Sequence, residues 1–350
     1  MALKHISKEF VGVIGAGKFG TTIANLLAQN TKVLLYARRP ESIEAMRATR
    51  TAAGQSLASN VQVVTQLAEI TQRCQVLFPV VPSSAFLALM QQLAPLLQPD
   101  HWLIHCTKGL VADWPAGSSG VLSTALTRAE VKTMSEVISA ISSVQQIGCL
   151  AGPNLADEIA QGQPAATVIA SSSADVVEAG KALLQDSCFQ VYGSSDLVGT
   201  ELCGALKNMV AIGAGCLRGL GYGENAKAHL VTCGLAEMME IGRAMGIPAQ
   251  SFLGLAGIGD LVATCASGLS RNYMVGYQLA QGTSSSQVVS NSEATAEGIN
   301  TTRIMKSLSQ HYAMKVPITE GVYRILFEQA DVQEVMQTLL TQSVARWAVA

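Results

Sequence analysis

Short apolar runs alternate with amphipathic stretches along the first half of the chain. The apolar runs predict strands at Phe10–Ile14, Lys32–Ala37, Val61–Val64, Gln75–Val81, Trp102–Cys106, Ala166–Ala170 and Phe189–Tyr192. The stretches between them repeat every three to four residues and predict helices at Phe19–Gln29, Leu67–Arg73, Ala85–Leu97 and Ala174–Leu184. Continuous apolar strands separated by helices are typical of a parallel sheet covered on both faces.

The pattern changes after Gly193, where no further strand is predicted. Long helical patterns follow at Gly199–Leu217, Ala226–Met245, Arg271–Ala280, Thr301–Tyr312 and Pro317–Glu328. We therefore expect an α/β domain over residues 1–194 and an all-helical domain over residues 195–350. Residues 113–120 and the serine-rich residues 284–292 are predicted to be exposed loops.

Composition agrees with two globular domains. The chain has 350 residues, of which 49% are hydrophobic and 14% charged, so apolar material for two cores is available. The net charge is −2 and no basic tract occurs, which argues against a nucleic-acid or anionic-membrane partner. The longest apolar segment, Met209–Leu217, is too short to span a bilayer. Lys18 interrupts the N-terminal apolar stretch, so no signal peptide is expected.

The eight cysteines and five histidines do not suggest a metal site. No two cysteines form a C-x-x-C pair, and no two histidines have the usual ligand spacing. We interpret the cysteines as small buried side chains in a reducing compartment, which favours a cytoplasmic location.

A glycine-rich motif directly follows the first predicted strand. Gly15, Gly17 and Gly20 form a G-x-G-x-x-G pattern that opens the first amphipathic helix. The first glycine permits a tight turn, the second lets a pyrophosphate approach the backbone, and the third lets the helix pack on the sheet. In this context the motif predicts dinucleotide binding, and a merely glycine-rich turn is the alternative.

The end of the second predicted strand bears on the choice of dinucleotide. An acidic side chain there usually binds the ribose 2′-hydroxyl of NAD, but this chain has Arg38 and Arg39. Two guanidinium groups suit a 2′-phosphate, so NADP(H) is favoured and NAD(H) is the second option. A solvated pair of loop charges is the alternative explanation.

Lys207 is the candidate acid–base residue of the second half. At helical spacing, Cys203, Gly204, Ala211 and Ala214 share its face, and these small residues leave room for a ligand. Apolar surroundings should lower the pKa of the ammonium, which suits a general acid for a carbonyl that receives hydride. A lysine that extends from a core helix to solvent is the alternative.

A set of motifs in fixed order then links both halves. The segments are Gly15-Ala-Gly-Lys-Phe-Gly20, Cys106-Thr-Lys108-Gly-Leu, Gly152-Pro-Asn154-Leu-Ala156, Gly204-Ala-Leu-Lys207-Asn208, Gly219-Leu-Gly-Tyr-Gly-Glu-Asn-Ala-Lys227, Gly254-Leu-Ala-Gly-Ile-Gly-Asp260-Leu, Leu269-Ser270-Arg271-Asn272 and Ala296-Glu297-Gly298. With these segments, the sequence resembles the NAD(P)-dependent glycerol-3-phosphate dehydrogenases over most of its length. The resemblance implies a Rossmann-type domain followed by a helical domain, with the active site in the cleft between them.

The resemblance also implies roles for individual residues. Lys207 would be the proton donor and acceptor. The residues that would bind the substrate are Lys108, Gly152, Asn154, Lys207, Asp260, Ser270, Arg271 and Asn272. The residues that would bind the cofactor are Gly15, Gly17, Lys18, Phe19, Gly20, Arg38, Arg39, Lys108, Ala156, Arg271, Thr295 and Glu297. Taken alone, Arg271 could be a surface charge and Asp260 a helix cap.

The reaction implied is reversible reduction of dihydroxyacetone phosphate to sn-glycerol 3-phosphate, which supplies phospholipid synthesis. The expected partner is a small phosphorylated substrate, and a homodimer is a plausible assembly. The sequence departs from the family pattern at Asn154, where Ser or Thr is commoner, at Lys18 in the glycine loop, and at Cys233, where Arg is common. A dehydrogenase of another hydroxy acid or sugar phosphate and a non-catalytic dinucleotide sensor are the two alternatives.

Overall fold

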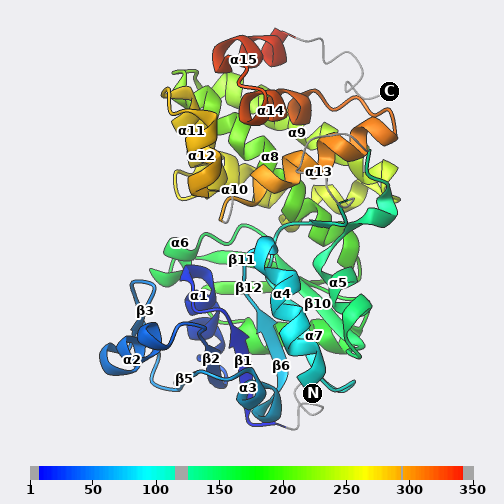
Figure 1. Ribbon diagram of the computed structural model, residues 1–350. Coiled ribbons are helices and arrows are strands. Elements are labelled where there is room, and N and C mark those ends of the chain that lie inside the picture. The colour runs from blue at the N-terminus through cyan, green and yellow to red at the C-terminus, as the bar shows by residue number, and fades with distance from the viewer. Residues whose placement is uncertain (1–7, 115–124, 293–294, 342–350) are drawn as a thin grey trace. The chain divides into compact units, whose positions relative to one another are not determined.

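The computed structural model describes residues 8–114, 125–292 and 295–341 and divides into two compact units (Figure 1). The first unit comprises the described residues of Met1–Thr107 and Met134–Leu197. The second comprises those of Lys108–Thr133 and Val198–Ala350. Each unit has its own hydrophobic cluster, as expected when a chain is too long for one core.

An eight-stranded sheet forms the centre of the first unit. Its strands lie in the order β12-β11-β10-β7-β6-β1-β2-β5. Their bounds are β1 Phe10–Ile14, β2 Lys32–Tyr36, β5 Val61–Val64, β6 Cys74–Pro79, β7 Trp102–His105, β10 Gln146–Ala151, β11 Ala165–Ala170 and β12 Phe189–Ser194. Six of them, from β5 to β10, follow the strand order of a dinucleotide-binding Rossmann sheet, with the order reversing next to β1. All neighbours are parallel except the pair β10 and β11, which is antiparallel.

Helices cover both faces of this sheet (Figure 1). The face that includes Val11 and Val13 packs with residues of α1 (Lys18–Leu27) and α7 (Ala174–Leu184). The opposite face packs against α3 (Leu67–Arg73), because a Cβ at Gly12 would lie 2.7 Å from a side-chain atom of Ile70. The remaining elements of the unit are α2 Pro40–Thr49, β3 Thr51–Ala52, β4 Gln55–Ser56, α4 Ser83–Leu93, η2 Ala94–Leu96, α5 Met134–Ile141 and α6 Ala156–Ala160.

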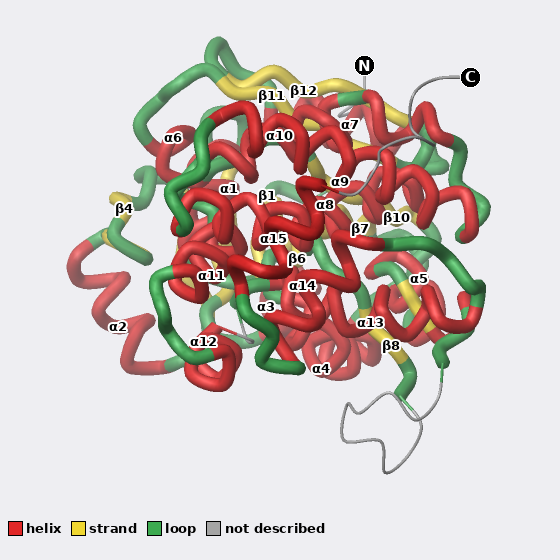
Figure 2. The backbone as a smooth tube through the Cα atoms, turned by 90° about the horizontal axis from the view of Figure 1, so that it is seen from above, coloured by secondary structure: helices red, strands yellow, loops and turns green. Residues whose placement is uncertain are grey.

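The second unit is built around α8 (Leu197–Gly219), which is buried along almost its whole length. Its other elements are η3 Arg128–Glu130, α9 Glu224–Ala244, η4 Ala249–Leu253, η5 Leu255–Gly259, α10 Asp260–Ala266, α11 Arg271–Ala280, α12 Ser285–Ser292, α13 Glu297–His311, α14 Pro317–Phe327 and α15 Val332–Thr341. The backbones of α8 and α11 touch, since a Cβ at Gly215 would lie 1.9 Å from the carbonyl oxygen of Tyr273. A short antiparallel pair, β8 (Val111–Ala112) with β9 (Val131–Lys132), is the exception to the helical pattern (Figure 2).

The alternation of parallel strands and helices predicted from the sequence is confirmed, and four of the differences matter most for the two units. Strand β10 (Gln146–Ala151) was not predicted, because a short apolar run can be a strand or part of a helix and periodicity alone does not decide between them. Residues 284–292, predicted to be a loop, mostly form α12, whose Val288 is buried in the core.

The other two differences concern the unit boundary. The structure divides after Leu197, and it places the described residues of 108–133 with the helical unit. This segment pairs there as β8 and β9 and packs Leu110 and Leu126 into the helical core. Residues 115–124, which include most of the predicted loop 113–120, lie outside the described residues.

Candidate active site

Lys207 lies at the centre of a buried cluster of charged and polar groups in the second unit. Its Nζ lies 2.5 Å from Oδ1 of Asp260 and donates to Oγ1 of Thr264 at 2.6 Å. The Nζ of Lys108 binds the other oxygen of Asp260 at 2.7 Å. One carboxylate is therefore shared by two ammonium groups.

Local structure explains how these groups meet. Asp260 and Thr264 stand one helical turn apart on α10, and the Thr264 hydroxyl donates to Oδ1 of Asp260 at 3.1 Å. Gly204 lies one turn before Lys207 on α8, and a Cβ there would contact the side-chain carbons of Lys108 at 3.4 Å. The small residue thus leaves space for the Lys108 side chain to reach Asp260.

Burial sets the ionisation of the cluster. Burial lowers the pKa of Lys207 to about 8, against the attraction of Asp260, and repulsion from Lys108 adds to the decrease. Burial also raises the pKa of Asp260, but Lys108 and Lys207 together outweigh it and hold that pKa below its usual range. A carboxylate that stays ionised beside a lysine that can lose its proton near neutral pH is suited to acid–base work.

Two buried asparagines lie beside Lys207. Asn208 donates through Nδ2 to the carbonyl oxygens of Lys108 and Gly204, both at 3.1 Å. Its Oδ1 accepts from Nδ2 of Asn272 at 2.8 Å, and Oδ1 of Asn272 accepts from the backbone N–H of Gly298 at 2.9 Å. These bonds tie the start of α13 and the start of α11 to the helix that carries Lys207.

The Ser270-Arg271-Asn272 segment begins α11, as predicted. Ser270 is the N-cap residue, and its hydroxyl accepts from the backbone N–H of Tyr273 at 3.2 Å. Arg271 is exposed, and it lines a cavity of about 180 Å³ together with Thr295. Glu297, half-buried, is the first residue of α13.

The glycine motif lies in the first unit, between β1 and α1. Gly15 has a φ of +123°, and a Cβ there would lie 2.3 Å from the carbonyl oxygen of Val80. A Cβ at Gly20 would lie 1.8 Å from the Gly15 carbonyl oxygen, so both positions require glycine. At Gly17, by contrast, a Cβ would meet open space, and no side chain caps the first turn of α1. These features fit a pyrophosphate bound at the helix N-terminus.

The other cofactor candidates of this unit lie around that turn. Lys18 is exposed and forms an ion pair with Asp157 of α6, with Nζ 2.5 Å from Oδ1. Phe19 and Ala156 are half-buried. The ion pair neutralises Lys18, so this departure from the family pattern adds little net charge near the pyrophosphate position.

Gly152 and Asn154 follow β10. Nδ2 of Asn154 donates to Oγ1 of Thr167 at 2.8 Å, while Oδ1 is buried and has no hydrogen-bond partner within the described chain. The Thr167 hydroxyl donates its own hydrogen to the carbonyl of Ala151 at 3.0 Å, which fixes the orientation of the amide. Asn154 therefore keeps a free acceptor oxygen, as expected of a residue that binds a ligand hydroxyl.

Arg38 and Arg39 stand where the sequence predicts them, directly after β2. Both side chains are exposed, and neither forms a hydrogen bond or an ion pair in the part of the chain that the structure describes. Arg39 is the N-cap residue of α2.

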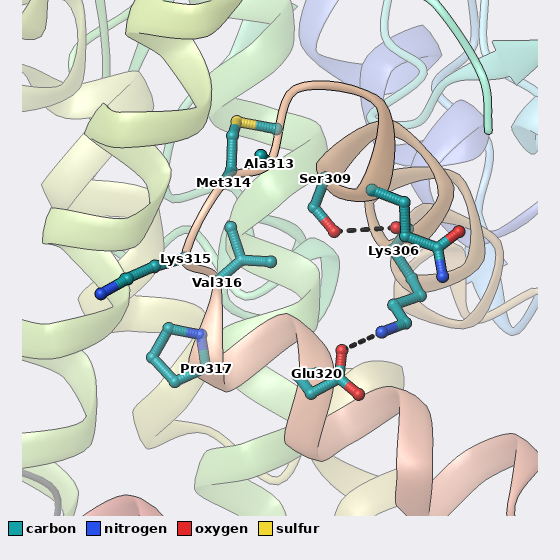
Figure 3. Close-up of a pocket in the computed structure, with 9 residues that line it drawn as sticks. Lys306, Ser309, Ala313, Met314, Lys315, Val316, Pro317 and Glu320 are labelled. Atoms are coloured by element: carbon teal, nitrogen blue, oxygen red, sulfur yellow. Dashed lines mark hydrogen bonds and ion pairs between the residues drawn. The ribbon is translucent and has the colours of Figure 1, made fainter.

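One further cavity of the second unit, of about 450 Å³, holds none of these residues (Figure 3). It lies between the end of α13 and the start of α14, and Lys306 and Glu320 form an ion pair beside it. The Lys315 side chain points away from this pair (Figure 3). None of the residues predicted for the active site lines this cavity, so it is not a candidate active site.

Thr264 and Asp157 are site residues that the sequence analysis missed. Thr264 follows Asp260 by four residues, a spacing that puts both on one face of a helix, but no helix was predicted there. Asp157 offered no comparable signal, because its partner Lys18 is far away in the sequence.

Comparisons with known proteins agree with this geometry. The model of the NAD-dependent glycerol-3-phosphate dehydrogenase N-terminus matches residues 10–177, and the model of the C-terminus of the same enzymes matches residues 196–337. The chain belongs to the NAD-dependent glycerol-3-phosphate dehydrogenase family. Within the described residues, no helix is both long and apolar enough to cross a membrane.

Individual relatives of the family match over nearly their whole length. Glycerol-3-phosphate dehydrogenase [NAD(P)+] of Azotobacter vinelandii is 39% identical over 96% of this chain and 95% of its own. The enzyme of the same name from Pseudomonas putida strain F1 is 40% identical, over 94% and 93%. The crystal structure of glycerol-3-phosphate dehydrogenase from Coxiella burnetii superposes with a TM-score of 0.84 at 30% identity, over 96% of this chain and 99% of that one.

Proposed function

We propose that the chain catalyses the reversible reduction of dihydroxyacetone phosphate to sn-glycerol 3-phosphate with NAD(P)H, with Lys207 as the proton donor and acceptor. The observation that carries the proposal is the buried cluster in which Lys207 shares Asp260 with Lys108. Membership of the family supports the substrate and the use of a nicotinamide cofactor.

The chemistry needs one hydride and one proton. A nicotinamide cofactor, when bound, supplies the hydride to carbon 2 of the ketone. Lys207 gives a proton to the carbonyl oxygen, so the C=O double bond becomes a C–O single bond and an O–H bond, and the lysine is left as a neutral amine. In the reverse direction the amine takes the hydroxyl proton. Its lowered pKa makes both forms accessible near neutral pH.

Asp260 and Lys108 support this transfer. Asp260 fixes the Lys207 amine through one oxygen, and its charge stabilises the ammonium form in a buried setting. Lys108, bound to the other oxygen, provides a second positive charge next to the reacting group, which favours the developing negative charge on the carbonyl oxygen. Thr264 restricts the direction of the Lys207 Nζ further.

The phosphate would bind at the start of α11. Arg271 is exposed there and can offer two parallel hydrogen bonds, while Asn272 retains one amide hydrogen beyond its bond to Asn208. Ser270 would contribute its hydroxyl hydrogen, because its oxygen accepts the capping bond. Gly152 and the free oxygen of Asn154 would bind a hydroxyl of the substrate.

The residues proposed to hold the cofactor are Gly15, Gly17, Lys18, Phe19, Gly20, Arg38, Arg39, Lys108, Ala156, Arg271, Thr295 and Glu297. The open space at Gly17 and the uncapped first turn of α1 support the pyrophosphate position. The two unpaired arginines support a preference for NADP(H), with NAD(H) accepted more weakly. We also propose that the enzyme acts in the cytoplasm, as a homodimer, and supplies glycerol 3-phosphate for phospholipid synthesis.

One experiment tests the proposal directly. The purified chain should oxidise NADPH when dihydroxyacetone phosphate is added, and far more slowly with unphosphorylated dihydroxyacetone. Arg271→Ala should lower kcat/KM for the phosphorylated substrate. The loss of transition-state stabilisation should be roughly 2–5 kcal/mol, as when a desolvated charge pair loses one member. The same change should leave the low rate with dihydroxyacetone almost unchanged. Equal rates of the unmodified chain with both compounds would contradict the phosphate assignment.

A further inference from the structure

A third cavity of the helical unit is lined by none of the residues proposed for catalysis. It has a volume of about 470 Å³ and lies among the end of α8, the first turn of α9, the end of α10 and α11. Tyr222, Gly223, Glu224 and Lys227 of its lining belong to the segment Gly219–Lys227, a motif that the proposed mechanism does not use.

The charged groups of this cavity are mainly positive. Arg218, in the last turn of α8, is exposed, and its side chain has neither an ion pair nor a hydrogen bond in the described part of the chain. Lys227 is paired with Glu224, whose side chain is 79% exposed and thus lies largely in solvent. The helix α9 starts at Glu224 after Gly223, and no side chain caps its first backbone N–H groups. Two cations and an uncapped helix N-terminus favour an anion.

A tyrosine that is largely buried belongs to the same lining. Tyr273 is 9% exposed and lines the cavity, and its hydroxyl forms no hydrogen bond within the described residues. Burial raises the pKa of Tyr273, and the groups that act on its charge are Arg218, Lys227, Glu224 and Tyr277. All four line the cavity together with Tyr273, so its protonated hydroxyl is a donor within the same lining. The ring of Tyr273 is thus held in the core while its unpaired hydroxyl can donate to a ligand in the cavity.

We infer that this cavity is a second ligand site, which binds a phosphate monoester with an apolar or aromatic substituent. Arg218 and Lys227, the first turn of α9 and the Tyr273 hydroxyl together offer donors from several directions, which suits a tetrahedral dianion better than a planar carboxylate. The volume exceeds what a phosphate alone needs, and Tyr222, Tyr277 and Met274 provide an apolar wall for the substituent. Lys227 would exchange Glu224 for the ligand.

Phenyl phosphate is a suitable probe, titrated against the full chain by calorimetry. We expect it to bind, with phenol not binding and inorganic phosphate binding more weakly. Arg218→Gln should lower the affinity for phenyl phosphate by about 10-fold or more, because a charge-assisted pair of hydrogen bonds is lost. Tyr273→Phe should lower the affinity for phenyl phosphate several-fold. Glu224→Gln should raise it, because a carboxylate that competes for Lys227 is removed. The matched control is Arg243→Gln, an exposed arginine near the other end of α9 that is paired with Glu240.

The substrate position must be separated from this cavity. Arg271→Ala should leave phenyl phosphate affinity within about twofold of the parent, while it lowers turnover of dihydroxyacetone phosphate. Arg218→Gln and Tyr273→Phe should lower the affinity for phenyl phosphate. In its absence, they should leave the turnover of dihydroxyacetone phosphate unchanged. Binding that is lost in Arg271→Ala, or that persists at full strength in both Arg218→Gln and Tyr273→Phe, would overturn the inference. Tyr273→Phe keeps the packing of the ring, so it remains decisive if Arg218→Gln were to fold poorly.

Discussion

Lys207 and Asp260 form a buried ion pair, with 2.5 Å between the ammonium nitrogen and Oδ1. Burial lowers the pKa of Lys207, and the attraction of Asp260 opposes that decrease only in part. The second ammonium, Lys108, takes the other carboxylate oxygen and repels Lys207. The result is a lysine that is bound and oriented, yet close to losing its proton.

The first prediction concerns the proton itself. Lys207→Ala should lower kcat for reduction by on the order of 10²- to 10⁴-fold, the usual contribution of a positioned acid or base. NADPH affinity should change little, because the glycine motif lies in the other unit. Lys306→Ala is a suitable control, since Lys306 is a lysine of the same unit with a carboxylate partner, Glu320, outside the cluster. A folded Lys207→Ala protein with near-normal kcat would exclude the proposed role.

The second prediction is a pH dependence that differs with the direction of reaction. The ammonium form of Lys207 is needed for reduction, and it is lost as the pH rises through its pKa of about 8. The rate of dihydroxyacetone phosphate reduction should therefore fall above about pH 8, while glycerol 3-phosphate oxidation should rise over the same range. The measurement is kcat in both directions from about pH 6 to about pH 10, with deuterated cofactor to show that hydride transfer limits the rate. Parallel profiles in the two directions would rule out Lys207 as the titrating group.

The sequence predicted the sheet better than it predicted the cluster. Strands such as Phe10–Ile14 and Val61–Val64 are found at the predicted residues, because a buried parallel strand needs a continuous apolar run. Strand β10 and helix α12 were not predicted, and their state is decided by tertiary packing rather than by a clear local pattern.

The cluster depends on contacts that no local pattern reports. Lys207 and Asp260 are 53 residues apart in the sequence, and Lys108 and Asp260 are 152 apart. The motifs placed each of them near a functional position, but only the fold shows that the two lysines share one carboxylate. The same holds for the free acceptor oxygen of Asn154, which depends on how Thr167 is oriented across the β10–β11 pair.

A third prediction follows from that oxygen. Asn154→Ala removes a buried acceptor without a partner and the hydrogen bond from Nδ2 to Thr167, so the free energy of unfolding should decrease by only about 1 kcal/mol. If the oxygen binds a substrate hydroxyl, however, kcat/KM for dihydroxyacetone phosphate should fall, with a loss of transition-state stabilisation of roughly 1 kcal/mol or more. The affinity for NADPH should stay constant. Asn154→Ser should recover part of the activity by restoring a polar group. An Asn154→Ala protein with unchanged kcat/KM would leave that oxygen without a role in the reaction.

The fourth prediction concerns stability of the helical unit. Glu237 of α9 is buried and accepts hydrogen bonds from the backbone N–H groups of Ile318 and Thr319 and from the Thr319 hydroxyl. Burial raises the pKa of Glu237 to about 7, although the bonds from Thr319 and Ile318 oppose this. Because the folded pKa lies above the unfolded one, the stabilisation is complete below about pH 4.5 and is lost as the pH rises through about 7.

Glu237→Gln isolates this effect, since the amide does not titrate and keeps a similar shape. We compare the free energy of unfolding of the parent with that of Glu237→Gln. The difference, parent minus variant, should fall by up to about 3 kcal/mol as the pH rises from below about 4.5 to above about 7. Urea unfolding of both proteins at several pH values measures the difference directly. A difference that stays constant with pH would mean that Glu237 titrates normally in the folded chain.

The last prediction concerns the choice of cofactor. Arg38 and Arg39 follow β2, where they are exposed and without partners in the described chain, so they can meet a 2′-phosphate without first breaking another bond. Charge-assisted hydrogen bonds of this kind are worth roughly 1.5–3 kcal/mol, which corresponds to about 10- to 150-fold in affinity. Replacing both arginines by Ala should raise the KM for NADPH by this factor and leave the KM for NADH nearly unchanged.

Arg47→Ala is the matched control, because Arg47 lies in the helix α2 that follows the two arginines and its side chain is bonded to the carbonyl of Val63. The NADPH preference of the parent should also weaken with added salt, because both arginines are exposed. If the double variant kept the preference of the parent, the selection would depend on other residues of the first unit.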